Sequence, residues 1–236
     1  MPEPTLRRQW RAGAQDLACL YRRDGLTGVL RRLGGRLAHA VYAGDDHLII
    51  RKDLTEEGTA PTDGAFRLER AGHQHLPLVA TFNARRCYRR ATNAFQSRLD
   101  RGYIGLVALL DGQMVGWVWC AEPRRHPYDA EIQRYRIPDR EGDVYAFDLV
   151  LGEEHRGQGN ATALLDQVHA ALASLGYRAM WGYIESDNVP SRWLFAISGH
   201  VVMGRSRGRR ILSRLLIVDR GVYLQGPRGL RPLLGR

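Results

Sequence analysis

The stretch Glu153–Gln167 joins a charged turn containing two glycines to the start of an apolar helical pattern. Gly157 and Gly159 lie between a run typical of a buried strand and the predicted helix, so the backbone there can approach a ligand closely. The positive end of the helix dipole favours an anion at this place, and Arg156 adds a charge-assisted contact. These residues alone fit two interpretations, a phosphate-binding turn and a tight loop without a ligand.

The spacing of the two glycines matches neither common nucleotide-binding fingerprint. No lysine follows at the place that G-x-x-x-x-G-K-[ST] requires, and the turn does not complete G-x-G-x-x-G. The elements around the turn must therefore decide between the two interpretations.

From residue 65 onward the sequence alternates between predicted strands and helices. Asp111-Gly112, between two β-rich runs, is a strong hairpin signal. The pattern predicts a strand, two helices, three strands, a helix, a strand, a helix and two strands, which makes an α/β protein with a central mixed sheet flanked by helices. The predicted elements cover residues 65–71, 73–83, 89–102, 103–122, 144–151, 161–176, 177–185, 186–199 and 200–219.

The helix after the glycine turn has one apolar face and an end signal. Gly176 is the expected cap at its C-terminus. The residues that make the apolar face are spaced for a helix packed on a core, and they are Leu164, Leu165, Val168, Leu172 and Leu175.

The first 64 residues form a basic N-terminal extension in this interpretation. Residues 1–40 have helix-like apolar spacing, 47–54 read as a short strand, and 55–64 as a polar linker with Pro and Gly. The predicted division is an extension at 1–64, an α/β domain at 65–220 and a C-terminal tail at 221–236.

Composition bounds the class of protein without naming a partner. The chain has 236 residues and a net charge of +10, and Lys52 is its only lysine. Arginine suits phosphate contacts, but a biased genome composition gives the same excess, so nucleic acid is not favoured. Contact of the extension with an anionic surface and a homodimer both stay open.

The cysteines and histidines do not indicate a metal site, and none is predicted. Cys19, Cys87 and Cys120 lack the spacing of metal ligands, and so do the paired histidines at 73 and 75 and His126. No apolar run approaches the ~20 residues of a membrane span. We therefore predict a cytoplasmic protein.

Two segments at the right separation give the turn a context. "DLVLGEEHRGQGNATALL" resembles the acyl-CoA-binding motif R/Q-x-x-G-x-G/A of the GNAT (GCN5-related) N-acetyltransferase superfamily. "NVPSRWLFAISGH" resembles the second motif of that family, with Asn188, Ser191, Leu194-Phe195 and Gly199 at its characteristic places. The predicted order of elements from residue 65 to 219 also matches the family.

The resemblance implies a binding site for acetyl-CoA, or a related acyl-CoA, as cosubstrate. The end of the strand before the turn would pair with the pantetheine arm, and a backbone N–H there would stabilise the oxyanion. Asn188 would contact the pantetheine side, and Ser191 and Phe195 are further implied cofactor-binding residues of the second motif. The implied cofactor-binding residues of the strand and the turn are Leu149, Val150, Leu151, Arg156, Gly157, Gln158, Gly159, Asn160 and Ala161.

The implied reaction is direct attack of a primary amine, from a small molecule or a protein, on the thioester within a ternary complex. Asp148 and Glu185 are the candidates for the base, and each has the alternative of a merely structural or solvated carboxylate. Asp148 lies in an otherwise apolar strand, which suggests a carboxylate that is buried at a cost in free energy. The tyrosine that often protonates the thiolate in the family is replaced by Phe195, and His200 stands where a phenylalanine is usual. Tyr183 is an alternative acid.

Phe195 also motivates a second hypothesis, a non-catalytic acyl-CoA-binding or regulatory module on the same fold. The loop Pro123–Asp143, dense in charge, lies where family members build the acceptor site. It has two interpretations, a substrate-holding loop and a solvated insertion.

Overall fold

The computed structural model describes residues 21, 25–27, 42–54, 66–84, 89–127, 129, 132, 135–157, 159–211, 214–220 and 231–232. The linker predicted at 55–64 lies outside this set. So do the helices predicted over 1–40, except at residue 21 and residues 25–27, which are helical. The proposed contact of the N-terminal extension with an anionic surface therefore stays a prediction.

The chain divides into two compact units, and the smaller one contains residues 72–102. Here the short 3-10 helix η1 (His73–His75) leads into α2 (Leu76–Ala84), which packs against α3 (Arg89–Asp100). Both helices were expected from the sequence. They are joined by a hydrogen bond that the Asn83 side chain donates to Thr92 over 3.2 Å.

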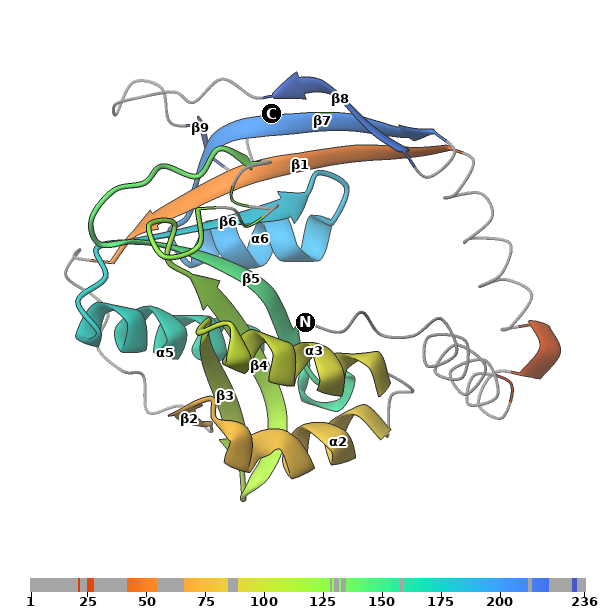
Figure 1. The fold of residues 1–236 in the computed structure, drawn as a ribbon, viewed down its shortest axis with the longest axis vertical. Coiled ribbons are helices and arrows are strands. Elements are labelled where there is room, and N and C mark those ends of the chain that lie inside the picture. Colours follow the sequence, from red (N-terminus) through yellow and green to blue (C-terminus); the bar gives the residue numbers. More distant parts are fainter. Residues whose placement is uncertain are drawn as a thin grey trace. The chain divides into compact units, whose positions relative to one another are not determined.

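The larger unit contains a mixed sheet, and its described strands are nine in number. They are β1 (Tyr42–Asp53), β2 (Arg67–Arg70), β3 (Ile104–Leu110), β4 (Gln113–Ala121), β5 (Asp143–Leu151), β6 (Ala179–Glu185), β7 (Val201–Ile211), β8 (Arg214–Arg220) and β9 (Arg231–Pro232). Their order is β2-β3-β4-β5-β6-β1-β7-β8, with β9 paired to β7 (Figure 1). The pair β5–β6 is parallel, whereas β1–β6, β2–β3, β3–β4 and β4–β5 are antiparallel. The predicted α/β fold with a mixed sheet is confirmed.

Strand β1 lies inside the sheet, between β6 and β7. Its register places His47 opposite Glu185 and Asp53 opposite Ala179. The expected strand at 47–54 is therefore present and begins five residues earlier, at Tyr42. The division at residue 64 stays a prediction, although this part of the N-terminal range is a strand of the sheet.

One face of the sheet is covered by α5 (Asn160–Ser174) and α6 (Val189–Ile197). The buried side chains that α5 contributes pack on apolar side chains of β3, β4, β5 and β6, among them Leu106, Val118, Val144 and Met180. Four of the five leucine and valine residues predicted on this helix are buried. Leu175 is the exception, since 48% of it is exposed. The helix ends at Ser174, so Leu175 leaves the apolar stripe and faces solvent.

The opposite face carries aromatic side chains, and parts of the segment between β4 and β5 lie buried against them. Tyr135 stacks on Tyr183 of β6 with ring centroids 4.7 Å apart, and His126 stacks on Tyr103 at 4.3 Å. Ile132 and Ile137 are also buried. These described residues of the loop are thus packed, not fully solvated. Among the residues that the structure describes, no helix is long and apolar enough to cross a membrane.

Candidate active site

The candidate site lies where two parallel strands separate. β5 and β6 pair only from Asp143 to Tyr145 and from Ala179 to Trp181. Beyond these residues, β5 runs on to Leu151 and β6 to Glu185 without pairing with each other. The gap between the two strand ends opens into a cavity of about 770 Å³, and residues of both strands line this cavity.

A β-bulge in β5 accompanies this separation. Trp117 pairs with Val150 and Trp119 with Phe147, so that one residue of β4 faces two of β5, Asp148 and Leu149. An extra residue bends the bulged strand and increases its twist. The bulge therefore explains why β5 turns away from β6.

Asp148 occupies the bulge in a left-handed backbone conformation, with φ 52°. The sequence suggested a carboxylate buried in an apolar strand, and that expectation is wrong, because the side chain is exposed. Its carboxylate accepts a hydrogen bond of 3.3 Å from the Trp117 indole N–H. Aspartate tolerates the left-handed region better than most residues, so the bulge itself accounts for an aspartate here.

This conformation leads to a prediction about stability. Replacing Asp148 by valine is expected to lower the free energy of unfolding by about 1–2 kcal/mol, because a β-branched residue is strained at positive φ. Asp148→Asn should stay within about 0.5 kcal/mol of the wild type, since asparagine adopts this conformation. Urea denaturation of the three proteins measures the difference. Equal losses in both variants would show that the carboxylate, and not the backbone conformation, holds the bulge.

The glycine turn forms another wall of the same cavity. Gly157 has φ 91° and Gly159 has φ 80°, a region that side chains other than glycine rarely adopt. A Cβ added to either glycine would meet no atom within 4 Å, so the space in front of the turn is open. Gly159 is the N-cap of α5, and the first turn of that helix starts at Asn160. Gln158 lies outside the described residues.

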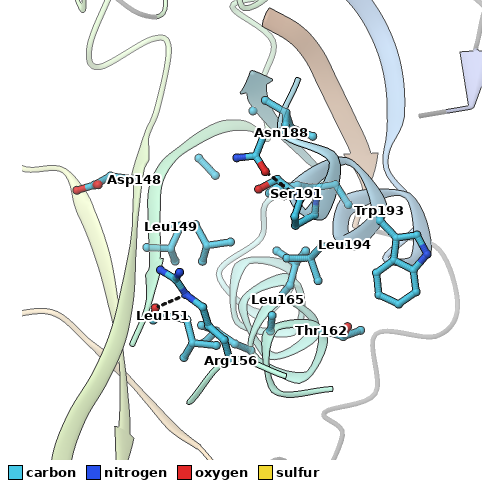
Figure 2. Close-up of a pocket in the computed structure, with 18 of the residues that line it drawn as sticks. Asp148, Leu149, Leu151, Arg156, Thr162, Leu165, Asn188, Ser191, Trp193 and Leu194 are labelled. Carbon is cyan, nitrogen blue, oxygen red and sulfur yellow. Dashed lines mark hydrogen bonds between the residues drawn. The ribbon is translucent and has the colours of Figure 1, made fainter. Parts of the chain in front are cut away.

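Side chains next to the turn fix its shape. The Arg156 Nε–H donates to the Leu151 carbonyl over 3.2 Å and so ties the turn to the end of β5 (Figure 2). The Asn160 side-chain amide donates to the His155 carbonyl over 3.1 Å. The short 3-10 helix η2 (Glu153–His155) connects strand and turn. Arg156 and Asn160, both predicted from the motif, thus shape the turn as well as flank it.

Helix α6, which belongs to the second motif, lines a further side of the cavity. The side-chain Oδ1 of Asn188 accepts a hydrogen bond of 3.1 Å from the Ser191 backbone N–H, which caps the start of the helix. Asn188 and Ser191 both line the cavity, as do Leu194 and Phe195. The ring of Phe195 also meets His200 edge-on, with centroids 4.8 Å apart. The two residues that depart from the family pattern are therefore in contact with each other.

The cavity reaches both faces of the sheet. Leu164, Leu165 and Phe195 line it on the helical side, whereas Tyr183 and Glu185 belong to the aromatic side of β6. Glu185 is exposed at the end of its strand. In Figure 2 the carboxylate of Asp148 lies on the other side of β5 from Leu149. Most of the predicted site residues are among those that line the cavity: Asp148, Leu149, Leu151, Arg156, Gly157, Gly159, Ala161, Glu185, Asn188, Ser191 and Phe195.

Several residues that line the cavity were not predicted from the sequence. The apolar wall comes from small and aliphatic side chains of the sheet, and Thr162 and Trp193 lie on the first turn of α5 and on α6. A residue in the first turn after a glycine motif is a candidate by position alone, and Thr162 is one such residue. The missed residues include Val118, Ala146, Met180, Gly182, Ile184, Thr162 and Trp193.

Two buried imidazoles lie behind Phe195. His169 of α5 and His200 have ring centroids 5.0 Å apart. The Lys52 ammonium lies close by, since it would be 2.9 Å from a Cβ on Gly199. Burial, with a smaller contribution from the Lys52 charge, lowers the pKa of His169 to about 3 from its ordinary value of 6.5. Burial also puts the pKa of His200 well below its ordinary value, and the charges of His169 and Lys52 lower it further.

These histidines predict a loss of stability in acid. The unfolded chain takes up a proton on each histidine near pH 6.5, whereas the folded protein resists protonation, so the free energy of unfolding falls as pH drops below about 6.5. One such histidine contributes a loss of about 2 kcal/mol between pH 7 and pH 5. Urea denaturation at both pH values should therefore show a smaller loss for His200→Phe than for the wild type. An identical pH dependence in the two proteins would contradict the assignment.

The histidines predicted not to bind metal have other contacts. The His75 Nδ1 accepts a hydrogen bond of 3.0 Å from the Gly72 backbone N–H, and His73 lies 3.2 Å from the Asp100 carboxylate. Across the described part of the chain, no three His, Cys, Asp or Glu side chains gather in a way that suits a metal ion.

Comparison with known proteins adds an independent observation. A family model described as "Acetyltransferase (GNAT) family" matches residues 71–199, which is more than half of the chain. No protein with a curated description matches the sequence.

Solved structures resemble the fold at low sequence identity. The GCN5-related glucosamine N-acetyltransferase region of a fungal multi-domain GH3 beta-N-acetylglucosaminidase is 14% identical, with a TM-score of 0.53 over 78% of this chain and 23% of that chain. A GCN5-related N-acetyltransferase from Sphaerobacter thermophilus is 19% identical, with a TM-score of 0.49 over 85% of this chain and 59% of that chain. This chain spans less than two thirds of either structure, and at such identity the first likeness shows the fold alone.

Proposed function

Because this chain belongs to the GNAT acetyltransferase family, we propose that it transfers an acetyl or related acyl group from acyl-CoA to an amine. The observation that carries the proposal is the cavity between the diverging ends of β5 and β6. A glycine turn that suits phosphate lines it on the helical side of the sheet, and two carboxylates belong to the opposite side. One cavity thus offers a place for both substrates of such a transfer.

The residues present fit acyl-CoA as cosubstrate. The open space in front of Gly157 and Gly159, at the N-terminus of α5, suits the pyrophosphate. The unpaired side of β5 near Leu149 and Leu151 suits the amide groups of the pantetheine arm, which would add as an extended strand. The cavity volume of about 770 Å³ falls within the ~300–1,000 Å³ typical of small-molecule sites.

Glu185 is the base that we propose for the acceptor amine, with Asp148 as the second candidate. Glu185 ends β6 at the gap, is exposed and lines the cavity. Removal of a proton frees the nitrogen lone pair, which forms the new C–N bond as the C–S bond of the thioester breaks. Because the amine attacks the thioester directly, no side chain of the protein needs to form a covalent intermediate.

The departing thiolate needs a proton source other than Phe195, which has none to give. Tyr183 is the residue that we propose, since its hydroxyl-bearing ring lines the same cavity. Stacking on Tyr135 and an edge contact with His47 at 5.0 Å hold the ring in place. Thiolate is a tolerable leaving group, so a modest contribution from this tyrosine is enough.

The phenylalanine at position 195 also favours a second candidate function, an acyl-CoA-binding module without transfer. A panel of small amines and peptide amines, incubated with acetyl-CoA and assayed for release of free CoA, separates the two. Release that depends on one class of amine supports the transferase. Saturable binding of acetyl-CoA without release for any amine in the panel would favour the binding module.

A further inference from the structure

Trp193 is a large apolar side chain that the fold leaves in solvent. It lies on α6, and 55% of it is exposed. The other tryptophans within the described residues, Trp117, Trp119 and Trp181, are at most 5% exposed. An indole this exposed gains little free energy from packing within the chain, and its place beside the cavity decides what else it can contact.

The position of Trp193 connects it to the cavity. Trp193 is one of the residues that line it, together with Arg156, Gly159 and Thr162 around the glycine turn. Figure 2 shows Trp193 and Asp148 on opposite sides of the view, with Arg156 and Thr162 between them. The indole therefore lies at the end of the cavity away from Asp148.

We propose that Trp193 is the platform on which the adenine ring of acyl-CoA stacks, an inference that rests on the proposed function. Acyl-CoA is a linear molecule in which the thioester and the adenine stand at opposite ends, with the pyrophosphate between them. A thioester at the strand gap and a pyrophosphate at the glycine turn direct the adenosine away from Asp148, toward Trp193. Stacking of a base on an aromatic side chain contributes about as much to affinity as a good hydrogen bond.

The alternative is that Trp193 belongs to an exposed apolar stripe that binds a protein partner. Val189, Trp193 and Ile197 are spaced four residues apart on α6, and all three are exposed. Only Trp193 of the three lines the cavity, however. A role as adenine platform requires only the residue that lines the cavity, whereas a partner helix or sheet would contact all three side chains.

The experiment compares two acyl donors by isothermal titration with the full chain. S-acetyl-4′-phosphopantetheine has the thioester, the pantetheine arm and one phosphate of acetyl-CoA but lacks the adenosine. Trp193→Ala is expected to weaken acetyl-CoA binding by about ten-fold or more and to change the affinity for the truncated donor less than two-fold. Trp193→Phe, which keeps an aromatic ring, should restore most of the lost affinity. Ile197→Ala is the matched control, because it removes an exposed apolar side chain from the same face outside the cavity.

Each other outcome has a distinct meaning. Unchanged acetyl-CoA affinity in Trp193→Ala would overturn the platform and favour the partner stripe. Equal losses for the two donors, or an equal loss in Ile197→Ala, would show that the substitution acts through α6 and not through adenine. If the wild-type chain binds neither donor, the proposed function fails, and the inference fails with it.

Discussion

Replacing Gly159 by valine is expected to weaken acetyl-CoA binding by about 100-fold, which corresponds to roughly 3 kcal/mol. Valine at φ 80° is strained by about 1–2 kcal/mol. A turn that relaxes to relieve this strain loses charge-assisted hydrogen bonds from its backbone N–H groups, which contribute about 1.5–3 kcal/mol each. The new side chain would also occupy the open space in front of the turn. Isothermal titration with acetyl-CoA measures the loss.

The matched control for this variant is Gly176→Val. Gly176 has φ 88° and, like Gly159, has no atom within 4 Å of an added Cβ. It follows the C-terminal end of α5, away from the turn, and it does not line the cavity. The control therefore has the same backbone strain and is expected to bind acetyl-CoA as the wild type does. If the two variants bound acetyl-CoA with equal affinity, the glycine turn would not be part of the acetyl-CoA site.

Replacing Glu185 by glutamine is expected to lower kcat by about 10²–10⁴, the usual contribution of a general base. Glutamine keeps the size and polarity of the side chain but cannot take the proton of the amine. Acetyl-CoA binding should stay within about two-fold, since the proposed role of the carboxylate is to deprotonate the amine and not to hold the phosphates. The measurement is the steady-state rate of CoA release with an amine that the panel identifies, together with titration of acetyl-CoA.

Asp187→Asn serves as the control for Glu185→Gln. Asp187 is an exposed acid two residues further on, and it does not line the cavity. Its removal changes the charge of the same turn without touching the proposed base. A kcat that is unchanged in Glu185→Gln would rule out Glu185 as the base. An equal drop in both variants would assign the effect to local charge.

The parts of the site that depend on short-range signals were predictable from the sequence. Gly157 and Gly159 both have a left-handed φ. The Asn188 side chain caps helix α6 by accepting a hydrogen bond from the backbone N–H of Ser191, three residues away. Such motifs are specified locally, so residue types and spacing are enough to find them. Asp111-Gly112 is a further case, since both residues have positive φ, as a two-residue hairpin loop requires.

The parts that depend on long-range pairing were not predictable. The exposure of Asp148 follows from the register between β4 and β5, in which two residues face one. The place of β1 between β6 and β7 joins His47 to Glu185, and no local pattern encodes such a contact. The motif around Trp193 did not indicate that this residue is exposed. Its exposure depends on how α6 is rotated against the sheet, which packing alone decides.

Titration of the full wild-type chain with acetyl-CoA is the measurement that tests the account most directly. The cavity between β5 and β6 predicts saturable binding of one acetyl-CoA per chain, with free CoA as a competitor for the same site. The absence of any binding at millimolar acetyl-CoA would contradict the account, because the glycine turn would then be a loop without a ligand.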